Sequence, residues 1–199
     1  MFKPLVLASG SPRRKDLLRL AGVKYRICVP DIDETPVETE SPRAMVRRLS
    51  REKALESWRN FLSAKQSAFI LSADTTVVSP GGRVLGKPRD SAEAVQMIRS
   101  LQGRVHQVLT GYTLLDVELG VLARSVTRVI RTKVAIQALS RLEIQRYVGL
   151  GESLDKAGAY AAQGFGMAII ESISGSYTNV VGLPMTEVMR DLKKFGWKR

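Results

Sequence analysis

The chain turns from an expected strand into an expected helix in the stretch Leu7-Ala8-Ser9-Gly10-Ser11-Pro12-Arg13-Arg14. An apolar run of strand length comes before it, Gly10 allows a tight turn, and Pro12 suits the first position of a helix. Ser11 is therefore expected to cap the helix with its side chain, and Gly22 to end it. The stretch predicts a strand, a turn and a helix in direct succession.

Two arginines, Arg13 and Arg14, fall in the first turn of this expected helix. The partial positive charge of a helix N-terminus makes a cation there unfavourable by roughly a few tenths of a kcal/mol. A phosphate among the free N–H groups, the serine hydroxyls and the guanidinium groups would reverse the sign. The spacing leaves two interpretations open, a phosphate site or an ordinary corner with both arginines in water.

Acidic residues follow at two places where they need a partner. Asp33 and Glu34 belong to a loop of carboxylates, which is either solvated turn chemistry or a set of ligands for a divalent cation. Asp74 interrupts the apolar run from Ala68 to Val78, where an unpaired carboxylate is costly to bury. Asp74 is therefore the best catalytic candidate from physical reasoning, with a structural salt bridge as the alternative.

Lys53 is a candidate phosphate ligand, and Lys87 is a second lysine whose backbone setting can be predicted. Lys53 shares a helix face with Val46 and Leu49, so it either extends along the apolar edge into water or meets an anion on the inner side. Lys87 precedes Pro88, which disfavours helix at that position, so this lysine is presented from an extended segment.

The remaining elements are expected from periodicity and turn residues. Strands are expected over 25–29, 68–78 and 167–173, with a long hairpin of 105–116 and 121–136. Helices are expected over about 41–60 and 90–103, after the capping pair Ser140 and Glu143, and in the last part up to Gly196. The segment 155–166 is rich in small residues, which allow close approach of the backbone.

Composition bounds the class of protein. The chain has 199 residues, with 31 Lys and Arg against 19 Asp and Glu, and a net charge of +12. This charge favours polyanionic partners, but it is scattered and lacks an aromatic stacking array. Attraction of small phosphorylated anions explains it as well as nucleic acid does, and we do not expect a nucleic-acid partner. No apolar run reaches transmembrane length and no secretory signal pattern is present, so we expect a cytoplasmic protein without a membrane partner. The only histidine, His106, is expected to be structural.

Six blocks of sequence, taken together, resemble the Maf family of nucleoside triphosphate pyrophosphatases over nearly the whole chain. They are residues 8–14, 51–54, 73–75, 86–88, 155–160 and 175–184. The resemblance implies one Maf-like domain over residues 1–199. It also implies a mixed α/β fold similar to that of the inosine triphosphate pyrophosphatases, with an elongated mixed sheet flanked by helices and a cleft between two lobes.

The resemblance further implies hydrolysis between the α- and β-phosphates with a divalent metal, Mg²⁺ or Mn²⁺, as cofactor and a role in cleaning nucleotide pools. It makes Asp74 the general base and places Glu34, together with Asp74, at the metal. The neighbouring acid Asp33 leaves that metal assignment open. The residues implied on the phosphate side are Ser9, Arg13, Arg14, Lys53 and Lys87.

Branches of this family differ at three positions, which are Arg13, Thr75 and Gln163 here. The combination is similar to the branch acting on dTTP and UTP, and the amide of Gln163 can both donate to and accept from a pyrimidine edge. The alternatives are a pyrophosphatase for methylated GTP or other modified nucleotides, and a basic nucleic-acid-binding or cell-division regulatory protein. A homodimer is compatible with the sequence.

Overall fold

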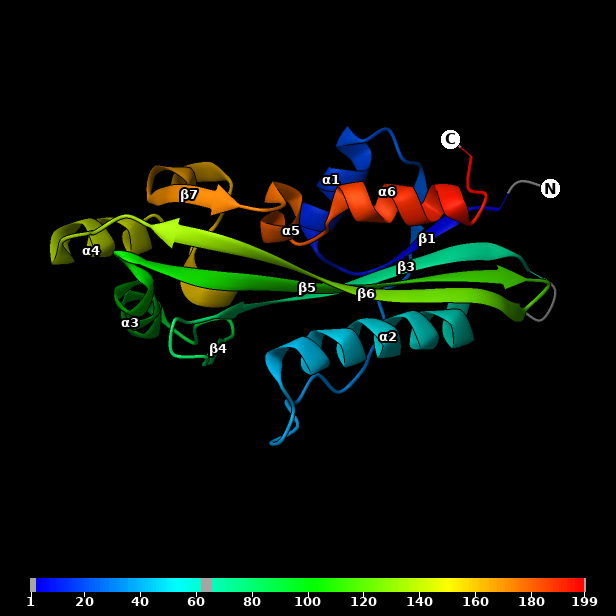
Figure 1. Cartoon of the computed structure of the whole chain (residues 1–199), viewed down its shortest axis with the longest axis horizontal. Helices are drawn as coiled ribbons and strands as arrows, with labels where there is room; N and C mark the ends of the chain where they lie inside the picture. Colours follow the sequence, from blue (N-terminus) through cyan, green and yellow to red (C-terminus); the bar gives the residue numbers. More distant parts are fainter. Residues whose placement is uncertain (1–2, 62–65, 199) are drawn as a thin grey trace. The chain divides into compact units, whose positions relative to one another are not determined.

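The computed structural model describes residues 3–61 and 66–198 and has a mixed α/β architecture (Figure 1). Within these residues seven strands form one sheet in the order β2-β1-β3-β5-β6-β7, with β4 paired to β3. β1 runs parallel to β2 and to β3, whereas β4 is antiparallel to β3 and β7 to β6. The strands are β1 Leu5–Ala8, β2 Tyr25–Ile27, β3 Ala68–Val78, β4 Val84–Leu85, β5 Arg104–Glu118, β6 Val121–Ile136 and β7 Ile170–Ser174.

Helices flank this sheet, which confirms the predicted mixed α/β class. They are α1 Pro12–Leu20, α2 Pro42–Phe61, α3 Ser91–Leu101, α4 Arg141–Gly149, α5 Tyr177–Val181 and α6 Met185–Lys194, with short 3-10 segments η1 Ala157–Ala159 and η2 Gly164–Ala168. Over residues 3–61 and 66–198, no helix has both the length and the apolar character needed to cross a membrane. The expected cleft between two lobes stays a prediction.

One predicted strand is displaced and one helix was not expected. The strand expected over 167–173 begins only at Ile170, because η2 occupies 164–168. Gly164 has a φ of 64°, a left-handed conformation that ends extended backbone. The five-residue helix α5 is too short to produce a helical hydrophobic period in the sequence.

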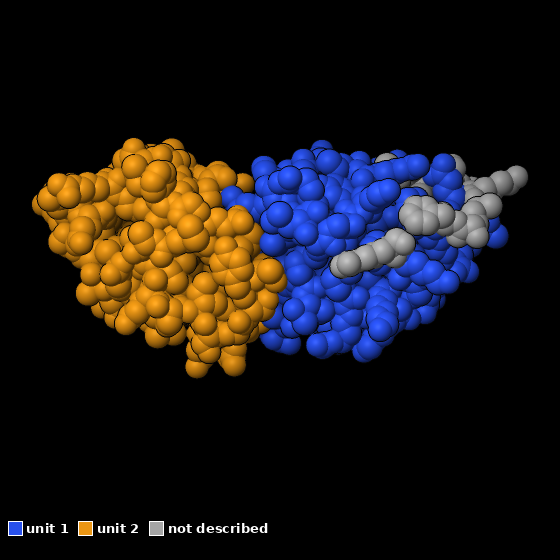
Figure 2. Space-filling model, turned by 90° about the horizontal axis from the view of Figure 1, so that it is seen from above, with its two compact units in different colours: residues 1–74, 110–130, 182–199 blue, residues 75–109, 131–181 orange. Residues whose placement is uncertain are grey.

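The chain divides into two compact units, coloured separately in Figure 2. Unit 1 comprises residues 1–74, 110–130 and 182–199, and unit 2 comprises residues 75–109 and 131–181. Each has an apolar cluster of its own, around Ile70 and Leu115 in unit 1 and around Ile98 and Ile136 in unit 2. The expectation of one domain over 1–199 stays a prediction.

In unit 1, α2 covers one face of the sheet and α1 and α6 lie on the other (Figure 1). Successive side chains of β5 point to opposite faces of the sheet, so neighbouring residues contact different helical layers. Thr113 Oγ1 lies 3.2 Å from the hydroxyl of Ser50 in α2, whereas the neighbouring Tyr112 hydroxyl donates to Asp191 Oδ2 in α6 at 2.7 Å. The strand therefore fixes both helical layers through adjacent residues.

In unit 2, His106 lies in the core and its side chain is bound to Tyr160. It is 1% exposed, and its Nε2 lies 2.7 Å from the Tyr160 hydroxyl. Burial lowers the pKa of His106 from 6.5 to about 4, because the neutral ring is the form that tolerates an apolar environment. This placement agrees with the structural role expected for the only histidine.

We expect His106 to make the protein sensitive to mild acid. Because the folded pKa is below the unfolded one, the unfolded chain binds the proton first. The free energy of unfolding should therefore fall as the pH drops from 6.5 to about 4, by on the order of 3 kcal/mol from this residue. Denaturant titrations at several pH values between 6.5 and about 4 give the free energy of unfolding for the unaltered chain and for His106→Gln. Plotted against pH, this free energy should fall more steeply for the unaltered chain, and parallel plots would contradict the assignment.

Candidate active site

The first turn of α1 has the predicted cap residue but not the predicted cap bond. Ser11 is the N-cap with extended backbone, yet its side chain makes no capping hydrogen bond in the described structure. Instead the backbone N–H of Ser11 donates to Ser9 Oγ at 3.2 Å. The hydroxyl that orders the turn thus comes from two residues earlier, at the end of β1.

Arg14 reaches inward from this turn and is held at two points. Its Nη1 donates to Ser9 Oγ at 3.0 Å and its Nε donates to the carbonyl oxygen of Gly182 at 2.9 Å. Burial lowers the pKa of Arg14, while the negative charges of Asp74 and Glu34 act in the opposite direction and the charge of Arg13 adds to the lowering. Arg14 therefore supplies a positive charge in a fixed position, and it interacts electrostatically with the carboxylates of Asp74 and Glu34.

The centre of the site is a lysine between two carboxylates. Lys53 in α2 and Asp74 in β3 are each 8% exposed, and Lys53 Nζ lies 2.7 Å from Asp74 Oδ1. The same Nζ lies 2.9 Å from Glu34 Oε1, whose side chain is 59% exposed. An ammonium group has three donors, so two carboxylates leave one N–H of Lys53 for a further acceptor.

The sheet and α2 bring these groups together. The parallel register pairs Ala8 of β1 with Ser72 of β3, so Ser9 and Asp74 follow within two positions of that pair on neighbouring strands. Ser72 Oγ donates to the carbonyl oxygen of Ser50, which seats α2 on β3 one helical turn before Lys53. The lysine that the sequence placed on the inner face of α2 therefore meets the aspartate that interrupts β3.

Glu34 and Asp74 are the carboxylates of the site that could serve as ligands for a divalent cation such as Mg²⁺. Glu34 and Asp74 already converge on one cationic atom, Lys53 Nζ, and Mg²⁺ commonly takes one or two carboxylates and completes its shell with water and phosphate oxygens. In residues 3–61 and 66–198 there is no group of three or more His, Cys, Asp or Glu side chains that could hold a metal. Asp33 is engaged elsewhere, since its Oδ1 accepts from the N–H of Thr35 at 2.9 Å, and hydrogen bonding to Thr35 lowers its pKa.

Three predicted residues lie in unit 2. Thr75 directly follows Asp74 in β3 and is half-buried, Lys87 is exposed in the loop before α3, and Gln163 is the half-buried residue that precedes η2. The loop of Lys87 is tied to η1, because the N–H of Gly158 donates to the carbonyl of Gly86 at 3.0 Å. Unit 1 brings Ser9, Arg14, Glu34, Lys53 and Asp74 together. The functional roles of these five residues and of Arg13, Thr75, Lys87 and Gln163 stay predictions.

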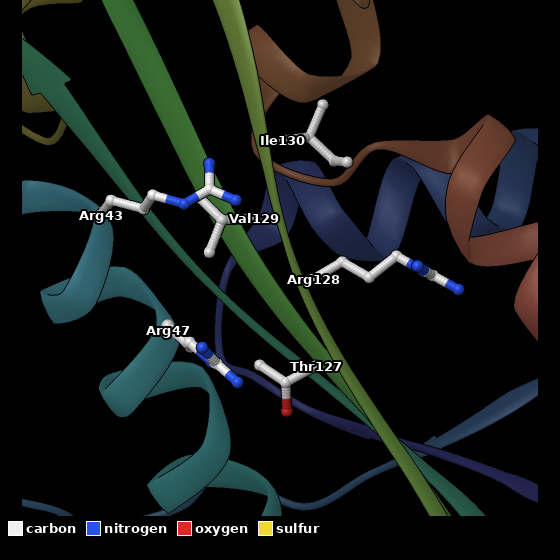
Figure 3. Close-up of a pocket in the computed structure, with 6 residues that line it drawn as sticks. All are labelled: Arg43, Arg47, Thr127, Arg128, Val129 and Ile130. Atoms are coloured by element: carbon white, nitrogen blue, oxygen red, sulfur yellow. The ribbon is translucent and has the colours of Figure 1, made fainter.

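A separate basic hollow of about 330 Å³ lies in unit 1 (Figure 3). Arg43 and Arg47 extend from α2 toward Thr127 and Val129 of β6, whereas Arg128 points away from them, where its Nε lies 2.6 Å from Asp191 Oδ2. None of the predicted site residues lines it. Two arginines one helical turn apart on an exposed face are typical of a solvated basic surface.

Sequence reasoning missed the backbone partner of Arg14. Gly182 stands 168 positions after it, and its contribution is a carbonyl oxygen. A backbone acceptor carries no residue-type signal, so only its presence in a block with Leu183 and Pro184 drew attention to this part of the chain.

The chain is similar to known proteins over nearly its whole length. A family model described as Maf-like protein matches residues 4–195. The chain is 45% identical over 193 residues to a protein of Geobacter sulfurreducens named dTTP/UTP pyrophosphatase, covering 96% of each chain. It is 46% identical over 196 residues to a protein of the same name from Symbiobacterium thermophilum, covering 98% of this chain and 96% of that one. A solved nucleoside-triphosphatase, a dITP/XTP pyrophosphatase from Mycobacterium abscessus, aligns over 96% of this chain and 93% of that one, with 14% identity and a TM-score of 0.42.

Proposed function

Since this chain belongs to the Maf family, we propose that it hydrolyses dTTP and UTP to the nucleoside monophosphate and pyrophosphate. Relatives of that name match it at 45–46% identity over nearly their full length. The observation that carries the proposal is the buried ammonium group of Lys53 between Asp74 and Glu34. Such an arrangement of opposite charges suits a phosphorylated substrate, whose oxygens can replace or share these partners.

Phosphoryl chemistry of this kind depends mainly on positioning and charge. In the proposed mechanism Asp74 orients the attacking water and accepts its proton. Arg14, held by Ser9 and Gly182, and the remaining N–H of Lys53 bind phosphate oxygens and stabilise the charge on the departing pyrophosphate. Arg13 and Lys87 are proposed to add positive charge on the phosphate side.

Glu34 and Asp74 are proposed to hold Mg²⁺ or Mn²⁺, which when bound supplies further neutralisation of the phosphate oxygens.

Gln163, with Arg13 and Thr75, is proposed to select the base. Uracil and thymine present a carbonyl acceptor and an N–H donor on the edge that an amide reads, whereas cytosine presents the reverse pattern. A substrate drawn from the nucleotide pool makes the cytoplasm the proposed location, and a homodimer remains a proposal.

A panel of triphosphates tests the proposal. We expect the unaltered chain to release pyrophosphate from dTTP and UTP with kcat/KM at least about 10-fold above that for dCTP, GTP and methylated GTP, because the base edge must match the amide of Gln163. Both products are measured, since release of inorganic phosphate in place of pyrophosphate would rule out α–β cleavage. Preference for methylated GTP would favour the alternative substrate class, and salt-sensitive RNA or DNA binding without hydrolysis would favour the nucleic-acid alternative.

A further inference from the structure

The segment that carries Gln163 is held at both ends by side chains that follow or belong to α4. The N–H of Ala161 donates to the hydroxyl of Tyr147 at 3.1 Å. The N–H groups of Phe165 and Gly166 donate to the Glu152 carboxylate at 2.9 and 3.1 Å, one to each oxygen. The Tyr147 hydroxyl lies 3.4 Å from Glu152 Oε1, so the two holding points are themselves joined.

The backbone between these points is tightly folded. Gly166 has no side chain where the carbonyl group of Ala161 passes, so the two ends of the segment touch. Gly164 has a φ of 64°, and a Cβ there would lie 2.5 Å from Glu152 Oε2. Gln163 therefore sits within a closed loop of backbone, which both glycines and the Glu152 carboxylate determine.

The two holding groups are well suited to a fixed geometry. Burial raises the pKa of Tyr147 to about 12, so its hydroxyl stays protonated and both accepts from Ala161 and donates to Glu152. A carboxylate that accepts two backbone N–H groups forms charge-assisted hydrogen bonds, which are about twice as strong as neutral ones. Lys156 Nζ donates to the carbonyl of Glu152 at 2.8 Å and fixes the backbone of that residue.

We propose that Tyr147 and Glu152 are positioning residues that set the preference for uracil and thymine by fixing the amide of Gln163. The inference rests on the proposed function, in which Gln163 reads the base edge. Neither residue is expected to touch the substrate. Their effect passes through the backbone of 161–166, whose ends they hold.

Glu152→Gln is the direct test. The change keeps the size of the side chain but turns one acceptor oxygen into an NH₂ group, which faces the N–H of Phe165 or Gly166. A displacement of about 1 Å at a binding group can change rates by up to about 100-fold, so we expect the ratio of kcat/KM for dTTP to that for dCTP to fall at least about 10-fold. Tyr147→Phe, which removes only a hydroxyl group, should lower the same ratio and serves if Glu152→Gln does not fold.

Glu143→Gln is the matched control. Glu143 Oε2 accepts from the N–H of Ser140 at 2.7 Å in the capping box of α4, and no hydrogen bond joins its side chain to 161–166 among the described residues. This variant should lose stability and keep the substrate ratio. If the ratio follows stability in both Glu143→Gln and Glu152→Gln, the effect is structural and the inference is overturned.

Gln163→Ala separates the failure of this inference from that of the proposed function. No pyrophosphate release from dTTP by the unaltered chain would overturn the proposed function. If Gln163→Ala lowers the dTTP to dCTP ratio but Glu152→Gln does not, the positioning role is wrong and the base-reading role stands. If Gln163→Ala leaves the ratio unchanged, the base-reading role fails and this inference with it. The expected result is that the double variant Glu152→Gln with Gln163→Ala has the ratio of Gln163→Ala alone, because both changes act on one contact.

Discussion

Asp74→Asn should leave the fold intact and lower the turnover of dTTP by at least about 10³-fold. Asn has the shape of Asp, so its carbonyl oxygen can still accept from Lys53 Nζ, which lies 2.7 Å from Oδ1 in the unaltered chain, and Glu34 still supplies a negative charge to that lysine. The amide cannot accept the proton of the attacking water. Catalysis is therefore lost by a larger factor than binding or stability.

Asp33→Asn is the matched control for this prediction. It removes the charge of a carboxylate that is next to Glu34 in the sequence. The side-chain oxygen of Asn can still accept the hydrogen bond that Asp33 accepts from the N–H of Thr35. Steady-state rates with dTTP and thermal unfolding of the three proteins are compared at one metal concentration. Near-normal turnover in Asp74→Asn, or an equal loss in Asp33→Asn, would contradict the role given to Asp74.

The centre of the site was predictable because its members are awkward without partners. A carboxylate inside the apolar run 68–78 and a lysine on the inner face of a helix each need an opposite charge. The structure pairs them with each other, Lys53 with Asp74, so the salt bridge is present, whereas the catalytic role of Asp74 stays a prediction. Local pattern thus identified the two residues, although it could not tell that they meet.

Hydrogen bonds made by backbone groups could not be predicted from the sequence. The carbonyl of Gly182 that holds Arg14, and the N–H groups of Phe165 and Gly166 that hold Glu152, are the same chemical groups in every residue. The strand predicted from Met167 is wrong over residues 167–169 for a related reason. Its hydrophobicity fits a strand, whereas the 3-10 segment there depends on the conformation of Gly164 and on a carboxylate twelve positions earlier.

Gly111→Ala should destabilise the protein by about 3 kcal/mol and lower Tm by roughly 10 °C. A Cβ at this position in β5 would overlap the carbonyl oxygen of Val46, and its distance to the backbone N of Arg47 would be 3.0 Å. Both obstacles are backbone atoms of α2, so no side chain can rotate away to make room. Either the helix moves off the sheet or the strand bends, and both lose packing around the buried residues Val46 and Leu49.

Gly81→Ala provides the control, because a Cβ there meets nothing within 4 Å in the described structure and the residue has no positive φ. Its unfolding free energy should stay within about 0.5 kcal/mol of that of the unaltered chain.

Gly111→Ala should also lower turnover, since Lys53 lies on α2 two turns after Val46 and must keep its 2.7 Å distance to Asp74. Unchanged stability in Gly111→Ala would mean that α2 is not seated on β5 through its backbone, and the packing that holds Lys53 against Asp74 would then need another explanation.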